Sequence, residues 1–211
     1  GEHLVPEANA FLSFAVSIGP DLLIETAKLR ALRLCWARVL EASGVKPENR
    51  AAHIQAFSSK RMMTRVDAHT NILRVTCAAF AAAIGGADAI TTLPFTDALG
   101  LPTPFSRRVA RNTQFVLMEE SRLDHVADPA GGAWFVEKLT RELAELAWSK
   151  MQAIETQGGI IAALQSGALQ RAVAEARATR QAAFARRKET ITGVTDFPLL
   201  GQEPPQVLDH R

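Results

Sequence analysis

The chain has 211 residues, of which 47% are hydrophobic and 22% are charged, and its 24 lysines and arginines nearly balance 22 aspartates and glutamates. This composition excludes a disordered or fibrous chain, and the small net charge gives no electrostatic reason to expect nucleic acid as a partner. No apolar run approaches the roughly 20 residues that span a bilayer, and the first residues do not resemble a signal peptide. Cys35 and Cys77 lie in apolar stretches without metal-ligand spacing, so we expect reduced thiols and a cytoplasmic protein.

The first half of the chain predicts strands and helices in alternation. In chain order the expected elements are a strand over 11–17, a helix over 21–44, a strand over 52–57, a helix over 67–84 and a strand over 87–93. Apolar and β-favouring side chains mark the strands. Asp21 and Gly44 are typical of a helix start and a helix end, respectively.

The second half of the chain predicts more helix than strand. Helices are expected over 106–120, 133–154, 160–165 and 168–188, short strands over 124–129 and 191–195, and a flexible tail over 199–211. Alternating strands and helices indicate a parallel sheet covered by helices, either an open doubly wound sheet or a (β/α)8 barrel. A whole barrel needs eight strands and about 250 residues, so this chain fits at most part of one, as a domain over residues 1–198.

Few motifs in the chain carry chemistry by themselves. Asp67-Ala-His69 begins like the cobalamin-ligand motif Asp-x-His-x-x-Gly, but Ile72 stands at the glycine position. We therefore interpret Asp67 as a helix cap and His69 as a residue of the first helical turn. The glycine pairs fit no phosphate-binding loop, and no spacing of Ser, His, Cys and Asp indicates a nucleophile. The residues alone predict an α/β chain without an assigned reaction.

Three long strings, residues 80–95, 108–114 and 126–137, carry a resemblance to a known family. Together with residues 25–33 and 191–194, they resemble the methylmalonyl-CoA mutase family over most of residues 11–198. Members of that family interconvert methylmalonyl-CoA and succinyl-CoA through radicals generated from adenosylcobalamin. The resemblance implies an α/β fold that is the C-terminal half of an acyl-CoA-binding (β/α)8 TIM barrel, with parallel strands and covering helices.

The family's catalytic histidine has no counterpart in this chain. Catalytic subunits carry Arg-Thr-His-x-Gln-Thr-Ser-Gly on a barrel strand, and the histidine donates a hydrogen bond to the substrate thioester carbonyl. Alignment on Asp67, Asn71 and Arg74 puts Gln55 at the histidine position, and glutamine lacks a titratable imidazole. The chain also contains no tyrosine, whereas catalytic subunits use tyrosines beside substrate and corrin. These departures match the small, non-catalytic subunit, so we expect neither a catalytic residue nor a metal ligand here.

The resemblance also implies which residues face substrate or cofactor. Residues at matching positions near the barrel mouth are the candidates: Gln55, Arg111, Asn112, Gln114 and Glu155. The turn at 128–132 and the loop at 155–159 match the family as well. In catalytic relatives such loops lie toward corrin or substrate. For these two segments and for Arg111, Asn112 and Gln114 we favour a structural role, in capping helices and closing turns, over direct ligand binding.

The resemblance further implies a multi-chain enzyme. We expect adenosylcobalamin in the holoenzyme but none bound to this chain, which lacks the cobalamin domain. The expected partner is a catalytic large subunit or a second copy of this chain, with acyl-CoA in the complex and neither nucleic acid nor membrane. The alternatives are an acyl-CoA-binding or cofactor-loading module without mutase activity, and a divergent catalytic acyl-CoA mutase.

A partial barrel predicts an incomplete core. Its two end strands lack neighbours, and its inner face lacks the side chains that normally fill a barrel. The apolar residues expected to be partly open to water for this reason are Phe14, Val16, Ile54, Ile90 and Leu93.

Overall fold

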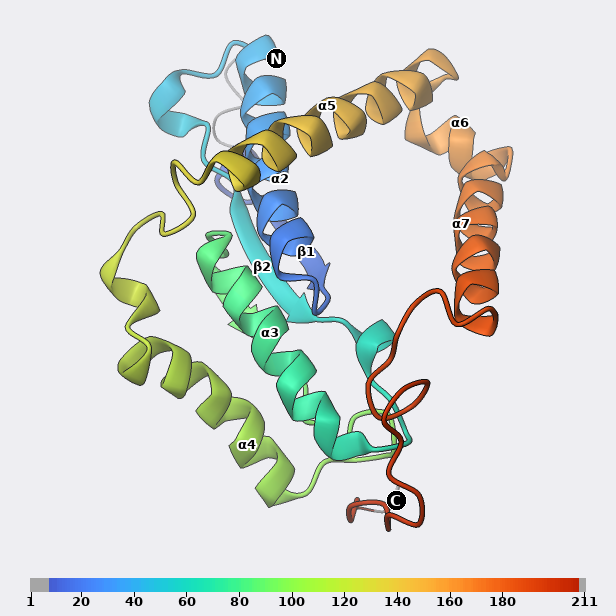
Figure 1. The fold of residues 1–211 in the computed structure, drawn as a ribbon. Coiled ribbons are helices and arrows are strands. Elements are labelled where there is room, and N and C mark those ends of the chain that lie inside the picture. Colours follow the sequence, from blue (N-terminus) through green and yellow to red (C-terminus); the bar gives the residue numbers. More distant parts are fainter. Residues whose placement is uncertain (1–7, 209–211) are drawn as a thin grey trace. The chain divides into compact units, whose positions relative to one another are not determined.

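Three parallel strands in the order β1-β2-β3 form one sheet in the computed structural model, which describes residues 8–208 (Figure 1). The strands are β1 (Ser13–Ile18), β2 (His53–Ser58) and β3 (Ala89–Thr91). Ala15 and Ala89 flank Gln55 from either side, because both lie in register with it. The three strands predicted in the first half of the chain are confirmed, and β3 is shorter than predicted.

One face of the sheet packs against helices. These are α2 (Leu22–Ala42) and α3 (Asn71–Ile84), and α4 (Pro104–Phe115) lies beside α3 (Figure 1). Every second residue of β2 is buried, as a half-covered strand requires. The core beneath the helices consists of Ile18, Leu29, Ala52, Ile54, Ala56, Met62, Val75, Ala78, Ala81 and Ala82.

The opposite face of the sheet carries small and polar side chains and one large apolar side chain, Phe57, and all of them are exposed or half-exposed. They are Ser13, Ala15, Ser17, His53, Gln55, Phe57, Ala89 and Thr91. Four of the five apolar residues expected to be open to water, Phe14, Val16, Ile90 and Leu93, are partly exposed as predicted, but the prediction is wrong for the exposure of Ile54 and for the face on which Phe14, Val16, Ile54 and Ile90 lie. Ile54 is fully buried, and Phe14, Val16 and Ile90 pack against the core on the helix side. Side chains alternate along a strand, and the covered face takes the larger apolar residues. Leu93 follows the end of β3 and is half-buried.

The predicted start is confirmed for α2 and is wrong for α3. The Asp21 carboxylate accepts a hydrogen bond from the Ile24 amide at 3.1 Å, which confirms Asp21 as the N-cap of α2. Helix α3 begins four residues later than predicted, because residues 68–70 form a 3-10 turn. Asp67 has a left-handed backbone with φ of 46°, and its carboxylate accepts from the Thr70 hydroxyl at 2.6 Å.

Within the described chain, residues 8–144 with 203–208 form one compact unit, and residues 145–202 form a second. Helix α5 (Trp134–Thr156) runs through the boundary, and the second unit continues with α6 (Gly159–Gln165) and α7 (Ala168–Ala185). Within the first unit, the amide of Leu208 donates to the carbonyl of Leu101 at 2.9 Å. The proposed division at residue 198 stays a prediction.

Two short strands predicted in the second half are absent from the described residues. Residues 123–125 form a 3-10 turn where a strand over 124–129 was expected. Near 191–195 there is only an isolated bridge between Thr192 and Asp196. A strand needs a hydrogen-bonded neighbour, and in the described chain the sheet ends at β3. Within residues 8–208 no helix is long and apolar enough to cross a membrane.

Candidate functional site at the carboxyl edge of the sheet

The loops that follow β2 and β3 lie at the same edge of the sheet, because the strands are parallel. In α/β folds this carboxyl edge is where ligands bind, since the loops there vary while the strands hold them in place. Residues 59–70 leave β2 and residues 92–103 leave β3. This edge is therefore the candidate functional site of the chain.

Asn71, at the start of α3, joins these two loops. Its side chain is fully buried. The amide nitrogen donates to the carbonyl oxygens of Thr64 and Phe95, both at 2.9 Å. The amide oxygen accepts from the Thr64 amide at 3.0 Å and from Arg74 at 2.8 Å. Asn71 thus satisfies its hydrogen-bonding capacity inside the protein, and its role is to fix the loops to each other.

His69 belongs to an aromatic cluster at the same edge. Its ring stacks on Phe95 with a centroid distance of 5.2 Å, and Phe95 meets Phe105 edge-on at 6.2 Å. Phe95 is buried, whereas Phe105 is exposed. His69 lies in the 3-10 turn before α3, which agrees with its interpretation as a residue near the helix start. Its ring packs the loop after β2 against the loop after β3.

Gln55 lies on the open face of the sheet, in the middle of β2. Its side chain is half-buried, and its neighbours across the strands are the methyl groups of Ala15 and Ala89. Small neighbours leave room above the amide, which can donate and accept hydrogen bonds but does not titrate near neutral pH. His53 lies two residues away on the same face and is exposed. Gln55 can therefore hold a polar group in place without exchanging a proton with it.

Arg111, Asn112 and Gln114 all lie in the last turns of α4, within the helix layer. The Gln114 side-chain nitrogen donates to the Thr92 hydroxyl at 3.1 Å, and that hydroxyl donates to the Ala110 carbonyl at 2.9 Å. Arg111 and Asn112 are exposed. Gln114 therefore fastens α4 to the end of β3 from the helix side, whereas Gln55 is on the opposite face of the sheet. The structure does not bring these two candidates together.

Glu155 lies near the end of α5, in the second unit, and is exposed. Its carboxylate lies within 4 Å of where a side chain on Gly159 would begin. Gly158 and Gly159 have φ of 98° and 83°, a left-handed backbone that favours glycine at both positions. Glu155 therefore covers the turn between α5 and α6, a placement consistent with the structural role favoured for this loop.

Arg30 is the residue of structural importance that the sequence reasoning did not single out. This arginine of α2 donates to Asp128 at 2.5 Å and to Glu137 at 2.6 Å, and only 17% of its side chain is exposed. Glu137 also accepts from the Gly132 amide at 3.2 Å. Arg30 thus clamps the turn at 128–132 and the start of α5 onto α2. An arginine within the string 25–33, on a helix otherwise rich in apolar residues, was the available signal.

Asp88 organises the opposite, amino edge of the sheet. Its carboxylate accepts from the Ile54 amide at 2.8 Å and from Arg33 at 2.9 Å, with His53 at 3.8 Å. Burial by itself would raise the pKa of Asp88, but these hydrogen bonds and the Arg33 charge lower the pKa below its ordinary value. Residues at this edge of a parallel sheet stabilise the fold rather than contact ligands.

The described residues offer little for metal or covalent chemistry. Within residues 8–208 no group of three or more His, Cys, Asp and Glu side chains could hold a metal ion. Cys35 and Cys77 are free thiols, and burial raises the pKa of Cys35. The carboxyl edge combines amide, hydroxyl and aromatic groups with charged side chains that are paired to them or to each other, such as Arg74 with Asn71 and Lys60 with Asp97.

A sequence model of the methylmalonyl-CoA mutase family matches residues 5–210. Methylmalonyl-CoA mutase small subunits of Streptomyces virginiae and of Propionibacterium freudenreichii subsp. shermanii are 50% and 45% identical to this chain, over 95% and 92% of its length. A methylmalonyl-CoA mutase of Escherichia coli (strain K12) is 36% identical over 94% of the chain. The matches cover 32%, 31% and 28% of these proteins, so the chain spans about a third of the length of the curated relatives it matches. With nearly its whole length matched, the chain belongs to the methylmalonyl-CoA mutase family.

Proposed function

We propose that this chain is part of a methylmalonyl-CoA mutase small subunit, which supports a catalytic large subunit and does not catalyse the isomerisation itself. The observation that carries the proposal is Gln55, an amide at the position of the family's catalytic histidine. An amide can hold the substrate carbonyl but cannot supply the imidazole that titrates near neutral pH. The greater identity to proteins named small subunits than to the Escherichia coli mutase supports the same conclusion.

The fold fits the proposal as the second half of an acyl-CoA-binding barrel. Its three strands are parallel, helices cover one face, and the other face carries small and polar side chains. A (β/α)8 barrel has its helices outside and its strand faces turned toward a common interior. Further strands beside β1 and β3 would close that interior over Gln55, Phe57 and their neighbours.

Adenosylcobalamin supplies the radical chemistry in this family, but the described residues do not fit as its ligands. Asp67 and His69 stand where a cobalt-ligand motif would begin. The Asp67 carboxylate is bonded to Thr70, and the His69 ring is stacked on Phe95. We infer that the cofactor of the holoenzyme binds elsewhere, and no step of the reaction is assigned to this chain.

The proposal places the protein in the cytoplasm, in a complex with the catalytic chain and with acyl-CoA. Two free cysteines and no disulfide among the described residues support a reducing compartment. Among the described residues β1 and β3 each pair only with β2, and these unpaired strand edges support completion of the sheet by further protein.

The test compares the full reading frame that carries this chain with and without a catalytic chain bearing the Arg-Thr-His motif. We expect a stable complex that converts methylmalonyl-CoA to succinyl-CoA, and no conversion by the small chain alone. Gln55→His in the small chain should leave both results unchanged, because one imidazole does not create a cofactor site. Conversion by the small chain alone, or tight retention of a CoA thioester without any complex, would overturn the proposal.

A further inference from the structure

Residues 203–208 return to the first unit after the chain has formed the second, and they lie along the loop that follows β3. The amide of Leu208 donates to the carbonyl of Leu101 at 2.9 Å, and the two residues form an isolated antiparallel bridge. Pro205 and Val207 are half-buried, whereas the residue between them is exposed. This alternation is that of an extended segment with one side against the protein. Residues 203–208 are called the strap below.

The strap meets the loop at a glycine that leaves room for it. A Cβ on Gly100 would lie 3.1 Å from a methyl carbon of Val207 and 3.3 Å from the Cβ of Val207. Gly100 does not have the positive φ that would by itself favour glycine. The absence of a side chain at Gly100 therefore serves the close approach of Val207, and not the conformation of the loop.

The contact at Gly100 is connected to the candidate site through the loop itself. The Gly100 amide donates to the carbonyl of Thr96 at 3.2 Å, and the neighbouring Phe95 carbonyl accepts from the side chain of Asn71 at 2.9 Å. Phe95 also carries the ring on which His69 stacks. The strap and Asn71 therefore hold the same loop at two points, one on each side of Thr96.

The closed loop is balanced between an unfavourable burial and a few favourable contacts. Thr96 is fully buried, and among the described residues its hydroxyl has no hydrogen-bond partner. Opening of the loop would let water satisfy this hydroxyl, so its burial opposes closure. The strap opposes opening through the Leu208 amide and the Val207 side chain, and Pro204 and Pro205 reduce the entropy that the segment loses on docking. Such a balance is typical of segments that open locally.

We propose that the strap holds the loop after β3 closed, and that its release opens the carboxyl edge of the sheet. In the closed state Thr96 is buried and Gly100 is fixed beneath Val207. In the released state the Thr96 hydroxyl is hydrated and the loop that carries Phe95 is free to move. This inference goes beyond the proposed function and does not depend on it, because it concerns the loop and not a reaction. Val207 and Leu208 are positioning residues in this device.

The experiment measures amide hydrogen exchange by mass spectrometry on the full reading frame that carries this chain. Val207→Ser should speed exchange in residues 96–103 at least fivefold, and Leu208→Pro should do the same because proline has no amide to donate. The matched control is Gln206→Ser, at the exposed position between them, which should change the rate less than twofold. Thr96→Val should slow exchange at least twofold, because closure then no longer buries an unpaired hydroxyl.

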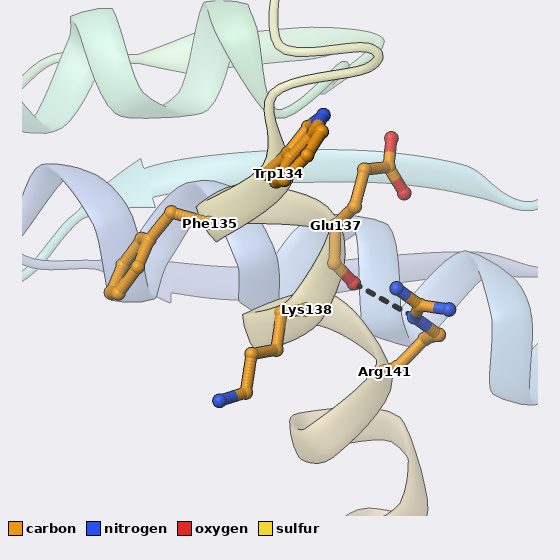
Figure 2. Close-up of a pocket in the computed structure, with 5 residues that line it drawn as sticks. All are labelled: Trp134, Phe135, Glu137, Lys138 and Arg141. Carbon is orange, nitrogen blue, oxygen red and sulfur yellow. Dashed lines mark hydrogen bonds between the residues drawn. The ribbon is translucent and has the colours of Figure 1, made fainter.

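The first turns of α5 provide an internal reference in the same unit (Figure 2). They are held by Arg30 through Glu137, and the Arg141 Nε donates to the Glu137 carbonyl at 3.3 Å, as Figure 2 shows. Because these contacts are independent of the strap, exchange in residues 134–141 should be the same in all four variants.

Three outcomes would overturn the inference. Unchanged exchange in residues 96–103 of both Val207→Ser and Leu208→Pro would mean that the loop stays closed without the strap. Equal acceleration in residues 96–103 and 134–141 would mean that the variants destabilise the whole unit. Faster exchange in Thr96→Val would mean that the hydroxyl stabilises the closed loop.

Discussion

Asp88 shows how one carboxylate can hold together the amino edge of a parallel sheet. Its carboxylate accepts hydrogen bonds from the backbone amide of Ile54 and from the guanidinium of Arg33. Since its pKa is lowered in the folded protein, the stabilisation is present above the unfolded pKa near 4 and is lost as the pH falls through the folded pKa. We expect Asp88→Asn to lower the free energy of unfolding by about 1–2 kcal/mol at pH 7.

The measurement is urea unfolding of both proteins between pH 3 and pH 7. The difference between wild type and Asp88→Asn should begin to shrink below about pH 4, because the carboxyl of the unfolded wild type takes up its proton there, and the folded carboxyl follows at its lower pKa. Asp124→Asn is the matched control, since the Asp124 side chain is 57% exposed and lies 3.8 Å from the equally exposed His125. A difference that stays constant with pH would contradict this role for Asp88.

The two cysteines differ in their surroundings, and their reactivity should differ accordingly. Cys35 is half-buried, its thiol donates to the Ala144 carbonyl at 3.6 Å, and burial raises its pKa. Cys77 is exposed on α3. Because the thiolate is the reactive form, Cys77 should react with Ellman's reagent at least tenfold faster than Cys35 at pH 8. The variants Cys35→Ser and Cys77→Ser assign the two phases, and equal rates in the two variants would contradict the prediction.

At the scale of elements, α2 packs tightly against the C-cap of α3 at Gly85. A Cβ there would lie 2.9 Å from the Ala81 carbonyl and 2.9 Å from a Leu29 methyl group. The backbone φ of Gly85 is −79°, so alanine would be resisted by this contact and not by conformation. Gly85→Ala should lower the free energy of unfolding by about 1–3 kcal/mol. Gly19→Ala is the control and should cost less, because its Cβ would meet only the side-chain carboxylate of Glu25, at 3.1 Å, and no backbone atom.

The clamp made by Arg30 joins α2 to the start of α5 through a forked pair of ionic hydrogen bonds. Lysine keeps the charge but cannot reach Asp128 and Glu137 together with the same geometry. Arg30→Lys should therefore lower the free energy of unfolding by about 1–2 kcal/mol and speed amide hydrogen exchange in residues 128–137. Arg38→Lys, in an exposed pair with Glu41, should change neither quantity measurably. An unaltered rate of amide hydrogen exchange in Arg30→Lys would mean that the turn at 128–132 keeps its conformation without the contacts of Arg30.

Some elements could be predicted from local sequence and others could not. The Asp21 cap and the alternation along β2 are local signals, and both hold in the structure. The segment at 124–129 looks like a strand by composition, but strand formation also requires a neighbouring strand, which the sequence of the segment does not reveal. The late start of α3 also depends on distant residues. The Asn71 side chain, at the first residue of α3, donates to the carbonyl oxygens of Thr64 and Phe95, and neither contact can be read from the sequence of the helix.

At the scale of the whole molecule, the sequence indicated the end of the sheet near which the candidate site lies, but not the face of the sheet on which each candidate side chain lies. Family matching placed Gln55 and Gln114 near one barrel mouth. Their side chains lie on opposite faces of the sheet, because Gln114 reaches Thr92 from α4 while Gln55 follows the alternation of β2. Which face a side chain takes depends on strand register, and a one-residue difference moves it to the other face. The same dependence misplaced Ile54 in the sequence-based prediction.

The open face of the sheet and the free edges of β1 and β3 should drive association of the 211-residue chain. Within the described residues both strands pair only with β2, and Phe57 on the open face is 37% exposed. The unpaired backbone groups of the two edge strands can pair with those of another chain, and Phe57 adds one large apolar side chain to the surface that association buries.

Sedimentation equilibrium should therefore give an apparent mass that rises with concentration above 22.9 kDa. Phe57→Ser should weaken this association, because it removes the largest apolar side chain from the open face. Phe115→Ser is the matched control and should leave the association unchanged, since Phe115 is 48% exposed but lies on α4 in the helix layer. A strictly monomeric chain at every concentration would mean that the sheet face and edges are covered within the chain, and that no second body is needed to complete the barrel.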